Sequence, residues 1–448
     1  MIISKMKDGK TIFKAWRENG KKKYEQIEFQ PYFYVEEDSH EPTTYSPSKY
    51  ITRDFEYIRG DWVNLDKKPL KKVIVDSSND IREAKKSFGK TYEADVPLHF
   101  RYCVDELDEM PEYKLRKWYW DMEWQQGGEH HDKITTIVVY DNYDKEYYQW
   151  LWLPNYDDSL EGKDIKDLDK FIFDNEKDML ENFMTTMVVK DPDMLIAWFG
   201  HFADIPKLLE RTCALGLNPQ MMSPTGHIKG IKKKKDSFSF AYGEKGFSPI
   251  EQPINGRITL SLDLAFERQW NDSQRGTLPS LSLNYIGETV LNKNKLVSEK
   301  FPDTNEFYRR AWLEDTETYL DYALQDVKLI VEIDEMNYCS EAILSLQRLL
   351  KAPFDACFYA SHMGSIYFMR NAWWKCKTGS KVEKRETYEG AMIYDPLSEQ
   401  TQGLHLNVAA FDFAGLYPSM MIARNISWET ISEEPTEFAV NILTPRDF

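Results

Sequence analysis

The sequence predicts a multidomain α/β and α+β protein with a β-rich N-terminal part. Short runs of β-branched and aromatic residues, separated by turn residues, fill the first quarter of the chain. Further on, strand patterns alternate with amphipathic helix patterns, which is typical of an α/β layer. The length of 448 residues suggests two to four domains and ample material for a buried core.

Residues 1–110 are expected to form the N-terminal domain. Residues 11–16 and 26–35 are rich in β-branched and aromatic side chains, and Asn19-Gly20 between them is a strong hairpin turn signal. We therefore expect two strands joined near this dipeptide.

Residues 111–335 are expected to form a second, α/β domain. Strands are predicted over 115–124, 134–140, 147–153 and 194–199, and helices over 174–188 and 206–215. This order of strands, helix, strand, helix fits a ribonuclease H-like layer. Residues 336–385 have mostly helical patterns, and strand signals resume from residue 386, with a buried strand predicted over 406–412.

Composition limits the class of protein. Hydrophobic residues make up 42% and charged residues 29% of the chain, as in soluble globular proteins. The formal net charge is −17, so any nucleic-acid footprint must be local. The clearest basic cluster is residues 232–235, with Lys229 just before it, and a solvated loop explains it as well as a phosphate contact does. A hairpin over about 236–257 is a further expectation.

The five cysteines are far apart and contain no C-x-x-C pair, which argues against a zinc site or a disulfide framework. The first residues lack the apolar core of a signal peptide, and no uncharged apolar run approaches the length of a membrane span. We expect a cytoplasmic protein with no membrane partner.

Three acidic signals fall inside the α/β region. Asp121 and Glu123 stand two apart on a predicted strand, so they project from one face. Paired carboxylates repel unless a cation lies between them, and Mg²⁺ or Mn²⁺ prefers such oxygen ligands. Asp204 follows a later strand at a helix start, where helix capping is the simpler explanation. Tyr322 and Asp326 share one face of a later helix, which fits an ordinary amphipathic helix equally well.

Taken together, the three signals resemble the exonuclease motifs of family B DNA polymerases. The resemblance implies a 3′→5′ exonuclease in which Asp121, Glu123, Asp204 and Asp326 hold two Mg²⁺ or Mn²⁺ ions and Tyr322 orients the attacking water. One departure is that residues 198–204 contain no Asn, and Ala203 stands where the family has an aromatic residue. His201 and Phe202 are both candidates to replace the Asn in holding the 3′ end.

The C-terminal region resembles the start of the same family's polymerase domain. The run from Asp412 to Ser419 resembles the motif D-x-x-x-L-Y-P-S, and residues 388–391 resemble Y-x-G-[G/A]. The resemblance assigns metal binding to Asp412 and Phe413, nucleotide binding to Leu416 and Tyr417, and DNA binding to Tyr388, Gly390 and Ala391. The family's later motifs, K-x-x-x-N-S-x-Y-G and D-T-D, are absent, so residues 386–448 are expected to be an incomplete palm.

The leading interpretation is the N-terminal and proofreading exonuclease portion of a family B replicative DNA polymerase of phage or viral type. Its expected partners are DNA primer-template, single-stranded 3′ ends and a second polypeptide with the rest of the polymerase, and a sliding clamp is a further candidate. DNA synthesis is expected only when the missing palm, fingers and thumb are supplied. A split enzyme and a truncated chain remain open, as do a stand-alone 3′→5′ exonuclease and a non-catalytic DNA-binding subunit.

Overall fold

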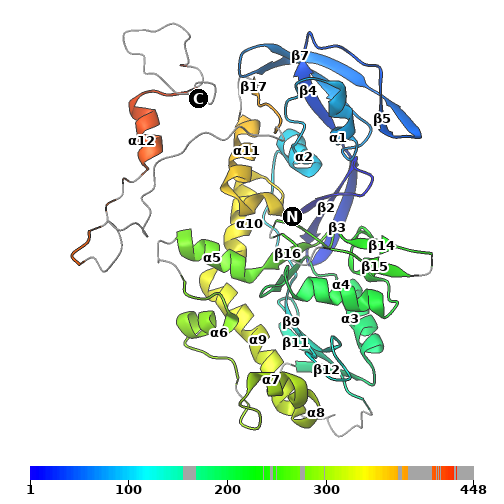
Figure 1. Ribbon diagram of the computed structural model, residues 1–448, viewed down its shortest axis with the longest axis vertical. Helices are drawn as coiled ribbons and strands as arrows, with labels where there is room; N and C mark the ends of the chain where they lie inside the picture. Colours follow the sequence, from blue (N-terminus) through cyan, green and yellow to red (C-terminus); the bar gives the residue numbers. More distant parts are fainter. Residues whose placement is uncertain are drawn as a thin grey trace, which may run out of the picture.

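The fold is taken from a computed structural model (Figure 1). It describes residues 1–154, 168–235, 237–242, 246–248, 250–272, 278–296, 298–371, 376–381, 406–409, 411, 413, 415–427 and 430. The predicted positions Tyr388, Gly390, Ala391 and Asp412 lie outside these residues.

The N-terminal part is built from β-strands. A three-stranded sheet contains β1 (Ile2–Lys5), β2 (Thr11–Glu18) and β3 (Lys21–Glu28) in that order. The turn between β2 and β3 is Asn19-Gly20, and both residues have positive φ, 51° and 76°, as a two-residue type I′ hairpin loop requires. The sequence signal for this hairpin is therefore confirmed.

The second predicted strand of this region is wrong in one respect. Residues 26–35 do not form one strand, because β3 ends at Glu28 and β4 (Tyr32–Glu36) starts a different sheet after Pro31. Proline has no N–H to donate to a ladder, so it favours such a break. The other elements here are β5 (Thr44–Ser48), β6 (Ile51–Asp54), β7 (Glu56–Asn64), β8 (Pro69–Ile74), α1 (Ile81–Ala84), η1 (Lys85–Ser87) and α2 (Leu98–Glu106).

A six-stranded sheet, called the central sheet below, organises the middle of the chain. Its order is β12-β11-β10-β9-β13-β16. β9 pairs antiparallel with β10 but parallel with β13, and β13 pairs parallel with β16. The bounds are β9 (Lys117–Trp124), β10 (Ile134–Asp141), β11 (Glu146–Trp152), β12 (Leu168–Phe173), β13 (Met194–Ala197) and β16 (Ile258–Ser261).

Helices cover both faces of the central sheet. On one face α3 (Glu176–Lys190) and α4 (Asp204–Ala214) contribute to a buried cluster with Trp118 and Trp120, whose rings lie 6.2 and 6.3 Å from that of Phe183. On the other face, α9 (Thr316–Asn337) packs Val327 and Ile330 into a second cluster. The strict alternation of β9 sends Tyr119, Asp121 and Glu123 towards α9, and the Tyr119 hydroxyl donates to Asp334 Oδ2 of that helix at 2.8 Å.

The remaining elements connect and extend these layers. A basic hairpin is formed by β14 (Ile231–Lys233) and β15 (Phe238–Phe240); it begins before the predicted range of 236–257 and ends inside it. The short helix η3 (Pro219–Met222) lies between α4 and β14. The elements that follow β16 are α5 (Leu262–Asp272), α6 (Leu283–Ile286), η4 (Gly287–Leu291), α7 (Thr304–Glu306), η5 (Phe307–Ala311) and α8 (Trp312–Glu314).

The chain then returns along the molecule to the N-terminal strands (Figure 1). The return contains α10 (Cys339–Leu350), η6 (Phe354–Phe358), α11 (Ala360–Asn371) and β17 (Cys376–Lys377), in agreement with the predicted helical segment. β17 pairs in parallel with β7, so one sheet combines N-terminal strands with a strand that follows α11, about three hundred residues later in the chain.

The buried strand predicted over 406–412 is wrong. The described residues 406–409 and 411 are not in a strand, and Leu406, Val408 and Phe411 are 75%, 73% and 95% exposed. A strand needs a ladder partner, and within the described residues none pairs with this segment. α12 (Leu416–Ala423) follows, and it buries none of its side chains. Among the described residues, no helix is long and apolar enough to cross a membrane.

Candidate active site

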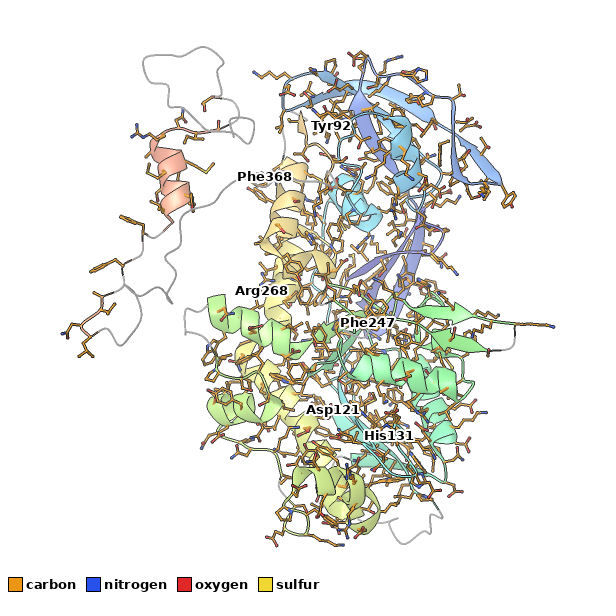
Figure 2. All side chains as sticks on the ribbon, in the orientation of Figure 1. Tyr92, Asp121, His131, Phe247, Arg268 and Phe368 are labelled. Atoms are coloured by element: carbon orange, nitrogen blue, oxygen red, sulfur yellow. The ribbon has the colours of Figure 1, made fainter. Side chains whose placement is uncertain are left out.

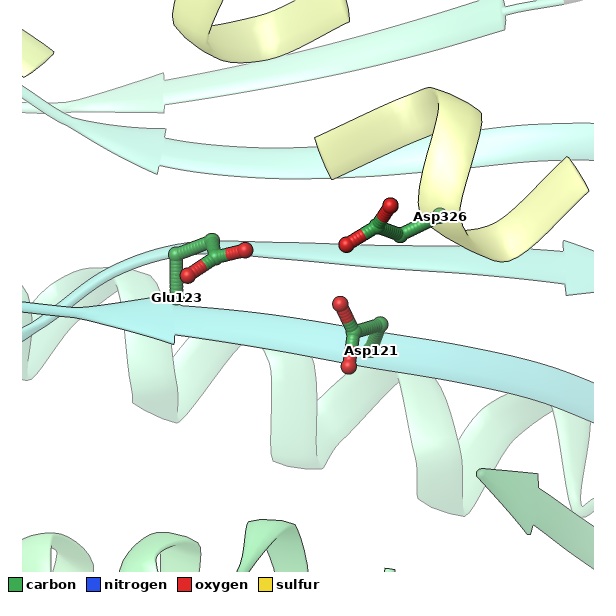
Figure 3. Close-up of side chains that lie close together, drawn as sticks. All are labelled: Asp121, Glu123 and Asp326. Carbon is green, nitrogen blue, oxygen red and sulfur yellow. The ribbon is translucent and has the colours of Figure 1, made fainter. Parts of the chain in front are cut away.

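Three carboxylates meet between β9 and α9. One oxygen from each of Asp121, Glu123 and Asp326 lies within 4.8 Å of the other two, and Figure 3 shows the three groups pointing towards one another. Asp121 and Glu123 come from one face of β9, opposite Val138 and Thr136 of β10. Asp326 comes from the middle of α9, about two hundred residues later in the chain. The position of Asp121 in the whole molecule is marked in Figure 2.

Asp204 lies beside this group but is not a member of it. It is the first residue of α4 and is only 3% exposed. The structure gives no side-chain cap hydrogen bond at this helix start, and Asp204 Oδ2 has no partner among the described residues. The N-cap residue is Ala203, so Asp204 does not occupy the capping position, and one of its carboxylate oxygens stays without a partner in the described part of the chain. Its charge acts on both Asp121 and Glu123.

A sharp turn carries Asp204 to this place. Phe199 has φ 57°, in the left-handed region that non-glycine residues rarely adopt. Its N–H donates to Asp263 Oδ1 at 3.2 Å, and its carbonyl accepts from Phe202 and Ala203. The next residue is a glycine, Gly200, and the turn requires one because a Cβ there would lie only 2.9 Å from the Ala197 Cβ. The turn is thus fixed by backbone geometry and one buried carboxylate.

The two candidates to replace the family's Asn differ in exposure. His201 is fully buried, and its Nε2 lies 2.9 Å from the Glu251 carbonyl oxygen and 3.2 Å from Thr259 Oγ1. Burial lowers the pKa of His201 to about 4. Phe202 is 43% exposed and Phe199 is 38% exposed. Of the two candidates, only Phe202 presents its side chain to solvent.

The electrostatics of the site favour a bound cation. Burial, followed by repulsion from Asp326, raises the pKa of Asp121 to about 7. Burial and the neighbouring Asp121 and Asp326 also raise the pKa of Glu123 well above its usual range. The pKa of Asp204 is raised by burial and by Asp121. Asp326 Oδ1, like Asp204 Oδ2, is buried without a hydrogen-bond partner among the described residues. A set of oxygen donors that includes these two unpartnered atoms fits the preference of Mg²⁺ or Mn²⁺.

Lys295 is a residue of the site that the sequence motifs do not reveal. Its ammonium donates to Asp326 Oδ2 and, at 3.1 Å, to the Tyr322 hydroxyl, and it lies 5.1 Å from the centre of the Tyr322 ring. The segment is held by Asn284, whose Oδ1 accepts the Lys295 backbone N–H at 2.8 Å. Asp326, Asp121 and Glu123 raise the pKa of Lys295 against the opposing effect of burial, so the lysine is charged. Tyr322 is thereby linked to the carboxylates.

The C-terminal candidates are not brought to this site. Phe413 and Tyr417 are 75% and 79% exposed, and Leu416 is 45% exposed at the start of α12. Their predicted partner Asp412 lies outside the described residues, so the structure gives no geometry for a second metal site.

Comparisons with known proteins identify two regions. Residues 108–265 match the model of the exonuclease domain of DNA polymerase family B, and residues 364–445 match the model of DNA polymerase family B. The first region includes Asp121, Glu123 and Asp204, and the second includes Asp412. Tyr322 and Asp326 lie between the two matched regions, so the structure is what connects them to the other carboxylates.

The relatives include DNA polymerases from a yeast and from archaea. The DNA polymerase delta catalytic subunit of Candida albicans is 26% identical over 311 residues, which cover 67% of this chain and 28% of that protein. The DNA polymerase of Thermococcus litoralis is 25% identical over 96% of this chain and 25% of its own length, and that of Thermococcus gorgonarius is 25% identical over 77% and 41%. The chain thus spans between a quarter and about two fifths of the length of these relatives. The protein belongs to DNA polymerase family B, of which it carries the exonuclease domain and part of the polymerase region.

Proposed function

We propose that this chain performs the proofreading reaction of its family, the hydrolysis of nucleotides from a DNA 3′ end. The observation that carries the proposal is the meeting of Asp121, Glu123 and Asp326 within 4.8 Å. Keeping three carboxylates together in a half-buried site costs free energy unless cations bind there. A cluster with raised pKa values in an α/β domain is a reasonable place for catalysis.

The residues divide into ligands and positioning groups. Asp121, Glu123, Asp204 and Asp326 are the proposed ligands of two Mg²⁺ or Mn²⁺ ions, which in nucleases activate water and stabilise the leaving oxygen. Tyr322 holds its hydroxyl beside this group, where it can donate to an oxygen of the attacking water or of the phosphodiester. Lys295 contributes a fixed positive charge, which offsets part of the carboxylate repulsion and attracts the phosphate.

Phe199 and Phe202 are the proposed surface for the terminal base. Both flank the turn that leads into Asp204, and both are partly exposed. Aromatic faces stack on every base, so two phenylalanines can hold a single-stranded 3′ end without reading its sequence. This platform replaces the family's Asn and aromatic pair, while His201 supports the turn from inside.

We also propose a fold class for the exonuclease domain and a division of the chain into four domains. The antiparallel β11-β10-β9 unit followed by the parallel β13 and β16 supports a ribonuclease H-like core for the exonuclease domain, with β12 as an additional edge strand. Divisions at 1–110, 111–335, 336–385 and 386–448 remain our proposal for the domains. The last of these would be the start of a palm.

A polymerase role rests on the family match at residues 364–445 and on the motif at Asp412. Because the chain spans only part of its relatives' length, we propose that nucleotide addition needs the remaining polymerase segments, on this or a second polypeptide. Within that assembly Asp412 and Phe413 would bind metal, Leu416 and Tyr417 the incoming nucleotide, and Tyr388, Gly390 and Ala391 the primer-template.

The test uses the 448-residue chain and a 5′-labelled single-stranded oligonucleotide with Mg²⁺. We expect stepwise shortening from the 3′ end, loss of activity with EDTA, and a fall of about a hundredfold or more in the variant Asp121→Asn with Glu123→Gln. The matched control is Glu335→Gln, which removes an exposed carboxylate from the same helix as Asp326 and should leave the rate unchanged.

Three outcomes separate the alternatives. Oligonucleotide binding without shortening in the wild type would favour a non-catalytic DNA-binding subunit. Equal activity in the wild type and the double variant would refute the site. A preference for mismatched over matched primer ends would support proofreading, whereas indifference to pairing would favour a stand-alone exonuclease.

A further inference from the structure

A second tyrosine lies beside the carboxylate site. The Tyr308 and Tyr322 hydroxyl oxygens are 2.8 Å apart. Tyr322 is on α9, whereas Tyr308 is on η5, a single π-helical turn between two short α-helical turns. Such turns occur often at functional sites, because the extra residue re-aims the side chains around it. No acidic motif or family match includes Tyr308.

The ring of Tyr322 is held on several sides. The Phe307 ring centre lies 5.0 Å from it, and the Tyr308 ring meets it edge-on at 6.0 Å and 88°. Lys295 lies over the ring, and Tyr322 itself is 7% exposed. The phenol therefore has a fixed position, and what remains to be set is the direction of its proton.

Hydrogen-bond capacity determines that direction. A phenol has one proton and can accept two hydrogen bonds, whereas an ammonium can only donate. Lys295 therefore occupies one acceptor site of the Tyr322 oxygen. If Tyr308 donates to the second, the only capacity left to Tyr322 is its own proton, which must then point to a third group. That group is the Asp326 carboxylate when no substrate is bound, and a substrate oxygen can take its place when Asp326 binds a metal ion.

An anionic substrate selects this arrangement. A phosphate oxygen only accepts, and a hydrogen bond to a charged acceptor is stronger than one between two neutral phenols. The Tyr322 proton is therefore drawn to the phosphate, and Tyr308 then donates to the oxygen that Tyr322 leaves free. Each bond polarises the next along Tyr308, Tyr322 and the acceptor.

We propose that Tyr308 is a positioning residue that makes Tyr322 a hydrogen-bond donor towards an oxygen of the reacting phosphodiester group. The inference rests on the exonuclease function proposed above and adds a residue to it. Tyr308 acts through Tyr322 and does not itself bind the metals or the attacking water. Its effect belongs to the chemical step, because the hydrogen bond strengthens as negative charge develops on the phosphate.

The test compares Tyr308→Phe, Tyr322→Phe and the double variant in single-turnover and steady-state shortening of a single-stranded oligonucleotide. Tyr308→Phe keeps the ring contacts and removes one hydroxyl. We expect kcat to fall about 3- to 10-fold, the effect of one hydrogen bond, with KM unchanged. Tyr308→Phe should cost nothing further when Tyr322 is already Phe, because the hydroxyl through which it acts is gone.

The control is Tyr148→Phe on β11, which removes another tyrosine hydroxyl of the same domain. Tyr148 packs with Trp120 and Phe183 on the α3 side of the central sheet, and its hydroxyl contacts Asp144 and Glu146. This variant should leave kcat unchanged. Binding of the oligonucleotide without added metal, followed by fluorescence anisotropy, should be the same for Tyr308→Phe and the wild type.

Two results would overturn the role of Tyr308 and leave the proposed exonuclease function intact. One is full kcat in Tyr308→Phe while Tyr322→Phe is impaired, and the other is an equal loss from Tyr308→Phe in both backgrounds, as a merely structural effect would give. A wild-type chain that shortens no oligonucleotide would overturn the proposed exonuclease function, and the role of Tyr308 with it.

Discussion

At the scale of single residues, Lys295 sets the electrostatic balance of the site. Its ammonium contacts Asp326 and faces Asp121 and Glu123, so it takes part of the neutralising role that a divalent cation would have. Two unit charges about 4 Å apart interact by roughly 4 kcal/mol at an effective dielectric constant near 20. The lysine and a metal ion therefore compete for the same negative charge.

Replacing Lys295 with Met should tighten metal binding while slowing hydrolysis. Methionine keeps an apolar stem but removes the positive charge, so we expect Mn²⁺ to bind about tenfold more tightly by calorimetry. The rate of oligonucleotide shortening should fall, because the phosphate loses a positively charged neighbour. Lys293→Met is the matched control, since Lys293 pairs with Glu332 at the surface. Weaker Mn²⁺ binding in Lys295→Met would contradict this balance.

The carboxylates could be predicted from sequence, but Lys295 and Tyr308 could not. Asp121, Glu123 and Asp326 have diagnostic spacing on regular elements, where period-2 and period-4 geometry fixes a face. Lys295 and Tyr308 lie between residues 287 and 311, where π-helical turns and loops alternate. No simple periodicity relates sequence to direction there, so only the folded chain reveals their neighbours.

At the scale of elements, the turn between β13 and α4 determines where Asp204 lies. It combines a left-handed Phe199 with a glycine that packs against Ala197. The sequence predicted a strand and a helix here, and both are confirmed, but it extended the strand to Phe199 instead of ending it at Ala197. The difference arises because the turn is stabilised by Asp263, which is distant in sequence.

Gly200→Ala should destabilise the protein and reduce the proposed exonuclease activity. A Cβ at this position would lie 2.9 Å from the Ala197 Cβ, so the backbone must shift, at a cost of about 1–3 kcal/mol. Asp204 would move with it. Gly364→Ala on α11 is the control, because nothing lies within 4 Å of its Cβ and alanine favours a helix by about 1 kcal/mol. Thermal unfolding would show opposite shifts, and a stabilised Gly200→Ala would contradict the packing argument.

At the scale of the whole molecule, buried ion pairs fasten the N-terminal sheet to the central sheet. Asp193, just before β13, is 1% exposed and accepts hydrogen bonds from Arg17 of β2 and from the Arg116 backbone N–H. Lys22 of β3 lies 3.3 Å from its other oxygen. The pairing of these charges could not be predicted from the sequence, because no local pattern relates residues 17 and 193.

Asp193→Asn should weaken this junction strongly. Removing one charge leaves Arg17 buried without its partner, which typically costs about 3–5 kcal/mol. Urea denaturation followed by tryptophan fluorescence would measure the loss. Glu28→Gln is the control, since its pair with Lys10 is exposed to solvent and should contribute little to stability. Similar small effects in both variants would mean that the two sheets are not coupled through Asp193.

The pairing of β17 with β7 has a consequence for biosynthesis. The sheet that contains β4, β7 and β8 receives its last strand only from residues 376–377. Two further contacts hold this segment in place: the Ser380 N–H donates to the Thr91 carbonyl, and Gly379 forms a β-bridge with Tyr92. A chain emerging from the ribosome therefore completes the central sheet first, while the β7 edge of the earlier domain stays open. An open edge can pair wrongly with other strands. Translation that pauses before residue 376 would thus prolong the interval in which a nascent chain is prone to aggregate.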